Sequence, residues 1–384
     1  MGYVLFFAAW VGHAALWLVG LNVLYSQPFH RSFLKAARLL VAVVVFGFPF
    51  ALWAIDGFDL LAIIVTDPSP PFMLLQLYLG LCFFISFWAI PVMTLFRLVR
   101  QTPRQLIARR RHIVDVSAQL GGKPAGDGRY RRVALLPGNQ VFQVEFTELT
   151  LQVPGLPAAW NNLTILQLSD LHLAGTPGEK FYETVIEQCL ADGMPNILAL
   201  TGDFVDTETN YRWLGPLLKP LRWDAGAFAI LGNHDIWYDP PSIRRELEQL
   251  GITVLGNGWR LLDLRGEPLV VIGHEGPWFR PKPDLKGCPE GAFRLCLSHS
   301  PDNIRWARRN RVQLMLSGHC HGGQIRLPVF GSLFVPSSYS RKYDCGLFFE
   351  DPTLLYVNRG LSGREPLRYN CRPEVTRLIL KKDP

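Results

Sequence analysis

The chain has 384 residues, of which 49% are hydrophobic and 18% are charged. This balance excludes an intrinsically disordered chain, because disorder requires low hydrophobicity and high charge. It is also too apolar for an ordinary soluble domain, so part of the chain is predicted to lie in lipid. The seven cysteines have no repeated spacing and do not form the pattern of a disulfide framework, which favours a reducing compartment.

Three apolar stretches occupy the N-terminal quarter of the chain, at residues 3–25, 39–55 and 72–96. A helix needs about 20 apolar residues to cross the hydrocarbon layer of a bilayer. The first and third stretches have that length, and the second has it if flanking residues join, so a re-entrant second segment is the alternative. The first stretch lacks the basic start of a signal peptide and is too long for one. Residues 1–100 are therefore predicted to be a transmembrane region of three helices.

The distribution of basic residues predicts the orientation of these helices. The connection after the first stretch carries three basic residues, whereas residues 56–71 carry three acidic residues and no Lys or Arg. A cluster of arginines follows the third stretch: Arg97, Arg100, Arg104, Arg109, Arg110 and Arg111. The positive-inside rule then places the N-terminus outside and the C-terminal part in the cytoplasm. The prediction is a multi-pass protein of the inner (cell) membrane with a cytoplasmic catalytic domain.

The arginines between residues 97 and 132 account for more than the whole net charge of +7. Binding of nucleic acid would require aromatic residues among them, and this stretch has almost none, so no nucleic-acid partner is expected. A topology signal with contacts to lipid headgroups fits better. Residues 101–132 are predicted to be a basic juxtamembrane linker, with a flexible break at the glycines of residues 121–128.

From residue 133 onward, short apolar runs end in polar residues. The runs lie at residues 163–168, 197–200, 228–231, 295–297 and 312–316. Their length and flanking turn residues are typical of buried strands. Residues 180–190 and 241–250 have helical patterns, so the domain is predicted to be a layered α/β fold. Ligands of such folds bind at the loops that follow the strands.

These five loops carry side chains that bind metals: Asp170, His172, Asp203, Asn233, His299, His319 and His321. Carboxylate and carbonyl oxygens suit Mn²⁺ and Mg²⁺, and imidazole also suits Zn²⁺ and Fe²⁺. Seven ligands are too many for one ion and about the number for two ions that share a carboxylate. The sequence therefore predicts a site for two divalent metal ions.

The order of these motifs resembles that of the calcineurin-like metallophosphoesterases. The family pattern is D-x-H, G-D-x-x-D, G-N-H-[DE], a lone His and G-H-x-H, and all five parts are present between residues 163 and 324. The segments H-G-G-Q at 321–324 and N-R-G-L at 358–361 are similar to a membrane-associated bacterial branch. Some members of that branch cleave the pyrophosphate of UDP-2,3-diacylglucosamine.

The resemblance implies a four-layer αββα sandwich over residues 133–384, preceded by the all-α transmembrane anchor. It also implies two divalent ions, with manganese expected and iron, zinc or magnesium acceptable. Asp203 would bridge the ions, and the other ligands would divide into Asp170, His172 and His321 for one ion and Asn233, His299 and His319 for the other. His234 would be the catalytic imidazole, with Asp206 holding its other nitrogen. Cys320, between two ligand histidines, is expected to point away and pack.

The expected function is hydrolysis of a phosphodiester or pyrophosphate bond by metal-activated water. Because the site would be tethered to the membrane, a lipid-linked substrate such as UDP-2,3-diacylglucosamine is expected. The alternatives are a broad phosphodiesterase or phosphomonoesterase on the same anchor and a non-catalytic scaffold, which intact motifs disfavour. The sequence leaves the oligomeric state open.

Several other side chains could contact substrate. Packing or solvent exposure is the competing interpretation for His274, Arg326, Arg359, Arg364, Trp237, Tyr238 and Trp278.

Overall fold

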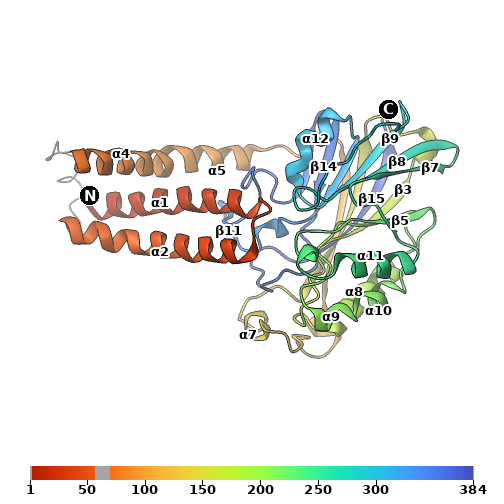
Figure 1. The fold of residues 1–384 in the computed structure, drawn as a ribbon, viewed down its shortest axis with the longest axis horizontal. Coiled ribbons are helices and arrows are strands. Elements are labelled where there is room, and N and C mark those ends of the chain that lie inside the picture. Colours follow the sequence, from red (N-terminus) through yellow and green to blue (C-terminus); the bar gives the residue numbers. More distant parts are fainter. Residues whose placement is uncertain (1, 57–69, 384) are drawn as a thin grey trace. The chain divides into compact units, whose positions relative to one another are not determined.

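The computed structural model describes residues 2–56 and 70–383. The chain forms two compact units. One comprises Met1–Gln101 together with Pro328–Ser340, and the other comprises Thr102–Leu327 together with Arg341–Pro384. We call them the helical unit and, after the activity that its motifs predict, the catalytic unit. Figure 1 shows the helices of the first and the two sheets of the second.

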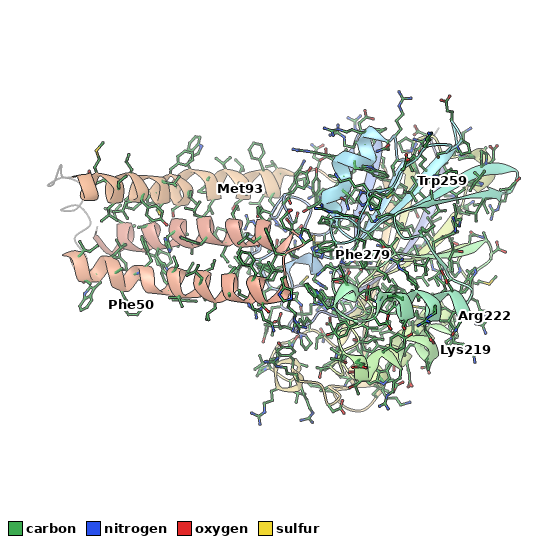
Figure 2. All side chains as sticks on the ribbon, viewed as in Figure 1. Phe50, Met93, Lys219, Arg222, Trp259 and Phe279 are labelled. Atoms are coloured by element: carbon green, nitrogen blue, oxygen red, sulfur yellow. The ribbon has the colours of Figure 1, made fainter. Side chains whose placement is uncertain are left out.

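The helical unit contains α1 (Gly2–Tyr25), α2 (Arg31–Asp56) and a third helix made of α4 (Pro70–Phe84), a π-helical turn (Ile85–Ala89) and α5 (Ile90–Val99). All three are long and apolar enough to cross a membrane. Because α2 already begins at Arg31, the flanking residues bring the second stretch to spanning length. Most of the acidic loop predicted at residues 56–71 lies outside the described residues. Apolar side chains such as Phe50 and Met93 project from the helices (Figure 2) and are exposed.

The polar side chain of His13 is accommodated inside the helical unit. Its Nδ1 lies 2.5 Å from the Tyr78 hydroxyl and its Nε2 lies 3.2 Å from the Val44 carbonyl. The ring stacks on Phe48 with 3.9 Å between centroids. Because hydrogen-bonding groups are costly in an apolar environment unless they are paired, these contacts hold the three helices together.

The catalytic unit is built on two mixed sheets. The first has the strand order β1-β2-β15-β3-β4-β5-β6 and the second has the order β13-β14-β10-β9-β8-β7. The strands of the first sheet are β1 (Leu106–Asp115), β2 (Gln143–Val153), β3 (Leu163–Leu168), β4 (Ile197–Leu200), β5 (Gly226–Ala229), β6 (Thr253–Val254) and β15 (Glu374–Lys382). Those of the second are β7 (Trp259–Leu264), β8 (Glu267–His274), β9 (Phe293–Ser298), β10 (Leu314–Ser317), β13 (Gly346–Glu350) and β14 (Thr353–Val357).

Short elements connect these strands. The α-helices are α6 (Val116–Gln119), α7 (Arg131–Ala134), α8 (Glu179–Ala191), α9 (Glu208–Tyr211), α10 (Leu214–Leu218), α11 (Pro240–Gln249) and α12 (Ile304–Arg309). Single 3₁₀ turns are η2 (Ala158–Trp160), η3 (Asp235–Trp237), η4 (Pro301–Asn303) and η5 (His321–Gly323). The short strands β11 (Arg326–Leu327) and β12 (Gly331–Ser332) lie in the chain on either side of the boundary between Leu327, of the catalytic unit, and Pro328, of the helical unit.

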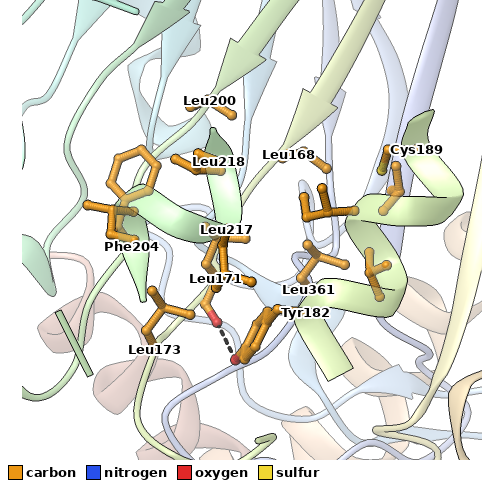
Figure 3. Close-up of a cluster of buried hydrophobic side chains, with 14 of the residues drawn as sticks. Leu168, Leu171, Leu173, Tyr182, Cys189, Leu200, Phe204, Leu217, Leu218 and Leu361 are labelled. Atoms are coloured by element: carbon orange, nitrogen blue, oxygen red, sulfur yellow. Dashed lines mark hydrogen bonds between the residues drawn. The ribbon is translucent and has the colours of Figure 1, made fainter. Parts of the chain in front are cut away.

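Two apolar cores hold the layers of the catalytic unit together. Successive side chains of a strand point to opposite faces, so Ile165 of β3 packs between the two sheets while Leu166 faces the helices. The helix-side core joins β3 and β4 to α8 and α10, where the Tyr182 hydroxyl donates to the Leu171 carbonyl (Figure 3). On the second sheet, α12 contacts β14. The predicted α/β sandwich preceded by apolar helices is confirmed.

Strand β1 lies inside the range 101–132, for which the sequence predicted a linker. It pairs antiparallel with β2 at the edge of the first sheet. Its arginines are exposed, and Arg110 and Arg111 form ion pairs with Glu148 and Glu145 of β2. Charged side chains on an edge strand oppose pairing with another chain. A run of arginines is therefore compatible with a strand, which the charge pattern did not indicate.

Candidate metal centre

The five ligand-bearing loops follow neighbouring strands. In the first sheet β3, β4 and β5 are parallel, and in the second β8, β9, β10 and β14 are parallel. The carboxyl ends of parallel strands lie at the same edge of a sheet, so the loops after β3, β4, β5, β9 and β10 meet. Each candidate ligand lies within a few residues of the end of its strand, so the two sheets fix its position.

The structure brings the predicted ligands into two clusters that share Asp203. Asp170, His172, Asp203 and His321 have ligand atoms within 4.8 Å of one another, and so do Asp203, His299 and His319. Asn233 joins the second cluster, because its Oδ1 lies 3.0 Å from His299 Nε2. All seven predicted ligands thus lie together, in the division that the resemblance implied.

The donor atoms at this site face one another in a way that fits cations. His299 Nδ1 bonds the Thr201 carbonyl at 2.7 Å, so in the neutral form that a metal ligand requires, this ring has its proton on Nδ1 and a lone pair on Nε2. That Nε2 lies 3.3 Å from Asp203 Oδ2, an oxygen with no hydrogen bond, and 3.0 Å from Asn233 Oδ1. Three lone-pair acceptors that converge repel one another unless a cation lies between them. The residues therefore fit a metal ion here.

The first cluster has the same character. His172 Nδ1 bonds Asp206 at 2.9 Å, which leaves Nε2 facing Asp203 Oδ2 at 3.5 Å and His321 Nε2 at 3.3 Å. His321 Nε2 lies 3.6 Å from Asp170 Oδ1. Burial and the neighbouring His172 hold the pKa of His321 well below its usual value, so the ring is neutral, as a ligand must be. A cation fits among these atoms as well.

The backbone at the site is strained. Asp170, His172, Asp203, His319 and His321 have positive φ angles, between 46° and 67°. Non-glycine residues seldom adopt this left-handed region, and such strain persists only where the surrounding structure imposes it. Five of the seven predicted ligands therefore have backbones whose conformation serves the placement of their side chains.

Two glycines of the motifs allow the loops to approach closely. A Cβ at Gly318 would collide with Asp170 Oδ2 and Ser169 Oγ, and one at Gly232 would collide with Asp203 Oδ1. Glycine is required at both positions because a side chain there would occupy the space of the ligand carboxylates.

His234 and His172 share one carboxylate. Asp206 Oδ1 lies 2.5 Å from His234 Nδ1, while Oδ2 lies 2.9 Å from His172 Nδ1. Burial opposes ionisation of Asp206, but both imidazoles hold its pKa well below the usual value. Burial also lowers the pKa of His234, but Asp206 and Asp203 raise it to about 10. The His234 side chain is 21% exposed, so a protonated imidazole faces the accessible side of the site.

Asp235 and Glu275 are functional residues that the sequence analysis missed. Asp235 is fully buried and accepts hydrogen bonds from the backbone N–H groups of four loop residues: Asp203, Phe204, Val205 and Gly232. Glu275 accepts from the Leu231 N–H at 2.7 Å and from Arg244. Asp235 therefore joins the loops after β4 and β5, and Glu275 holds the loop after β5. The acidic position of the G-N-H-[DE] motif was the available signal for Asp235.

The secondary candidates differ in burial, from the buried His274 to Trp237, which is exposed. His274 is buried and packs on Trp306, with 4.8 Å between ring centroids. Cys320 is buried and takes part in neither ligand cluster, and burial raises the pKa of its thiol well above the usual value. Trp278 lies beside the candidate ligands, because its ring contacts the rings of His319 and His299 at 4.8 and 5.6 Å.

The charged ends of Arg359 and Arg326 are mostly buried and are paired with carboxylates. Arg359 pairs with Glu145 at 2.8 Å and with Glu374 at 3.1 Å, and Arg326 pairs with Asp344 at 3.0 Å. The predicted solvent exposure of these two arginines is wrong, because each is satisfied by an internal carboxylate. The partners lie far away in sequence, which a local pattern does not reveal.

Arg368 restrains the loop of a candidate ligand. Its guanidinium is fully buried and donates to the carbonyls of His321 (3.0 Å) and Arg359 (2.9 Å), as well as to the carbonyls of Gly360 and Ser362. Ser362 N–H in turn donates to the Asp170 carbonyl. One guanidinium thus joins the loops that follow β10 and β14.

Replacing Arg368 by methionine is expected to lower the free energy of unfolding by on the order of 3 kcal/mol, because buried carbonyls lose their donors. Urea unfolding of the full-length protein measures the change. Arg309→Met, at an exposed arginine, is the control and is expected to have little effect. Equal stabilities of the two variants would contradict the restraining role.

Sequence comparisons agree with this geometry. The family pattern "Calcineurin-like phosphoesterase" matches residues 163–323. An uncharacterized metallophosphoesterase of Bacillus subtilis, YkuE, is 33% identical, covering 62% of this chain and 86% of its own. Phosphodiesterase YaeI of Escherichia coli is 33% identical over 56% of this chain and 81% of its own. UDP-2,3-diacylglucosamine pyrophosphatase LpxG of Chlamydia trachomatis is 28% identical, over 60% of this chain and 87% of its own.

The chain belongs to the calcineurin-like phosphoesterase family. It is therefore a metal-dependent hydrolase of phosphoric esters or pyrophosphates, which confirms the enzyme class predicted from the motifs. The family uses a dinuclear site for divalent metals, and the two clusters that share Asp203 supply candidate ligands for it.

Proposed function

We propose that this protein is a membrane-anchored phosphohydrolase with two divalent metal ions that cleaves a pyrophosphate or phosphodiester bond of a lipid-linked substrate. The proposal rests on one juxtaposition within the chain: three helices of spanning length precede a domain with the clustered ligand set. The name of the related LpxG supports a nucleotide-linked lipid such as UDP-2,3-diacylglucosamine as substrate. Manganese is the proposed metal.

The proposed roles of the residues follow from their positions. Asp170, His172 and His321 hold one ion, Asn233, His299 and His319 hold the other, and Asp203 binds both. Bound divalent cations neutralise the anionic ester and make water nucleophilic near neutral pH. His234 donates a proton from Nε2 to the leaving oxygen. Asp206 keeps the His234 ring oriented through Nδ1 and also orients His172.

Phosphorus NMR tests the substrate on the full-length protein in detergent with Mn²⁺ and UDP-2,3-diacylglucosamine. The expected result is metal-dependent formation of UMP and the acylated sugar phosphate, which chelation by EDTA abolishes. The Asp203→Asn variant, prepared in the same way, controls for contaminating hydrolases. Turnover of a simple aryl diester without turnover of the lipid would retain the hydrolase and exclude this substrate.

The second candidate is a broad phosphodiesterase on the same anchor, which the name of the related YaeI favours. In that case the full-length protein would hydrolyse bis(p-nitrophenyl) phosphate and several unrelated diesters at similar kcat/KM. A preference of more than about tenfold for the lipid, equivalent to about 1.4 kcal/mol, would argue against it.

We further propose that the protein spans the inner membrane three times with the catalytic unit in the cytoplasm. The arginines after the third helix support this orientation. Trypsin added to intact spheroplasts is expected to leave the catalytic unit whole, whereas trypsin added to inverted vesicles is expected to cleave it. Cleavage in spheroplasts alone would reverse the orientation.

A further inference from the structure

The segment Pro328–Ser340 belongs to the helical unit although the chain around it belongs to the catalytic unit. Asn22, the polar side chain near the end of α1, is almost fully buried against this segment. Its Oδ1 accepts the Val335 N–H at 3.0 Å and its Nδ2 donates to Ser340 Oγ at 3.1 Å. Ser26 Oγ lies 2.7 Å from Ser338 Oγ. The end of α1 therefore binds the segment through specific hydrogen bonds.

The segment also contacts the last residue of α1 and the last turn of α5. Phe334 packs edge-on against Tyr25 with 5.2 Å between ring centroids, and the Gly331 backbone lies directly against the Arg97 guanidinium. Tyr25 is the last residue of α1, and Arg97 lies in the last turn of α5. The first and third of three successive crossings run in the same direction, so these two helix ends belong to one face of the membrane. The segment lies across that face.

Three large apolar side chains of the segment are exposed, whereas Ser338 is its exposed polar residue. Val329, Phe330 and Leu333 are 58%, 46% and 40% exposed. Val329 lies at the centre of a tight turn, in which the Phe330 N–H donates to the Pro328 carbonyl at 2.7 Å. The φ angle of Val329 is 66°. Turns of this kind normally use Gly, Asn or Asp, and a β-branched residue at positive φ is an outlier. Exposed apolar side chains therefore gather at this turn.

We propose that Pro328–Ser340 is a lipid-contacting segment that inserts Val329, Phe330 and Leu333 into the interfacial layer of the bilayer. The inference rests on the membrane anchoring in the proposed function. The occupant of this surface is the glycerol and upper acyl region of phospholipids, because the segment is continuous with the ends of two apolar helices. Arg97 and the exposed Arg100 match the negative charge of anionic headgroups at the same level.

The position of the segment in the chain gives it a consequence for the enzyme. It directly follows β11, and the candidate ligand His321 lies shortly before β11. Insertion of the segment into lipid would therefore restrain the part of the chain that directly follows the His321 loop.

Photo-crosslinking of the full-length protein tests the proposal. Phe330 and Leu333 are replaced one at a time by p-benzoylphenylalanine, and the protein is reconstituted into vesicles of phosphatidylethanolamine and phosphatidylglycerol. Leu261 of β7, which is 50% exposed on the catalytic unit, is the matched control, and Phe46 of α2, which is 64% exposed, reports on the anchor. Mass spectrometry of the peptides identifies phospholipid adducts. Hydrolysis of an aryl diester verifies that each variant is folded.

The expected result is phospholipid adducts at positions 330, 333 and 46 and none at 261. Adducts at position 46 without adducts at 330 and 333 would overturn the lipid-contacting segment and leave the membrane anchor intact. Absence of adducts at position 46 would overturn the anchor itself and this inference with it. Crosslinks from 330 or 333 to a polypeptide would show that a protein covers the surface, which also overturns the proposal.

Discussion

The Asp203→Asn variant is expected to lose at least about a thousandfold in kcat/KM together with its bound metal. Asp203 is the residue that the two ligand clusters share. Two unit charges 4 Å apart interact by about 4 kcal/mol at an effective dielectric constant of 20. Loss of the carboxylate charge should therefore weaken the binding of each divalent ion by at least about a thousandfold. Asparagine preserves the shape of the side chain, so the effect reports the charge.

Metal content and activity of this variant are measured together, by plasma mass spectrometry and with an aryl diester. Asp284→Asn, at an exposed aspartate of the catalytic unit, is the matched control and should retain both ions. Two bound ions with unchanged turnover in Asp203→Asn would refute the shared-ligand role.

The second large effect is expected for His234→Ala. Positioned acids contribute about 10²–10⁴-fold, so turnover of diesters with alkoxide leaving groups should fall by that factor. Esters of p-nitrophenol should be affected much less, because their leaving group needs no proton. The metal content should change little, since His234 belongs to neither of the two clusters that contain Asp203 and is grouped only with His172 and Asp206. His112→Ala on the exposed edge strand is the control.

The same residue predicts a pH dependence. Asp206 and Asp203 raise the pKa of His234 to about 10 against the effect of burial, so the ring carries its proton at neutral pH. Because only the protonated ring is a donor, turnover of poor leaving groups should fall as the pH rises through this pKa, which bound cations displace downward. The alkaline decline should be absent in His234→Ala. An identical decline in the variant would assign it to another group.

Much of the candidate site could be predicted from the sequence. The strands at 163–168 and 197–200 begin and end as the apolar runs do, and the loops after them carry the ligands. The run 228–231 was less informative, because β5 ends at Ala229 while Ile230 and Leu231 are buried in the loop. Burial alone does not distinguish a strand from a buried loop, since both exclude water.

From the sequence alone, one could predict which residue types follow the strands, their order, and the three apolar helices before them. Only the tertiary structure reveals that Asp206 bonds His172 in addition to His234, which the resemblance had implied. It also decided that Arg368 restrains the His321 loop and that Pro328–Ser340 belongs with the helices. These contacts join residues far apart in the chain. Local patterns record periodicity and turn chemistry, whereas partners across a fold are selected by the packing of the whole chain.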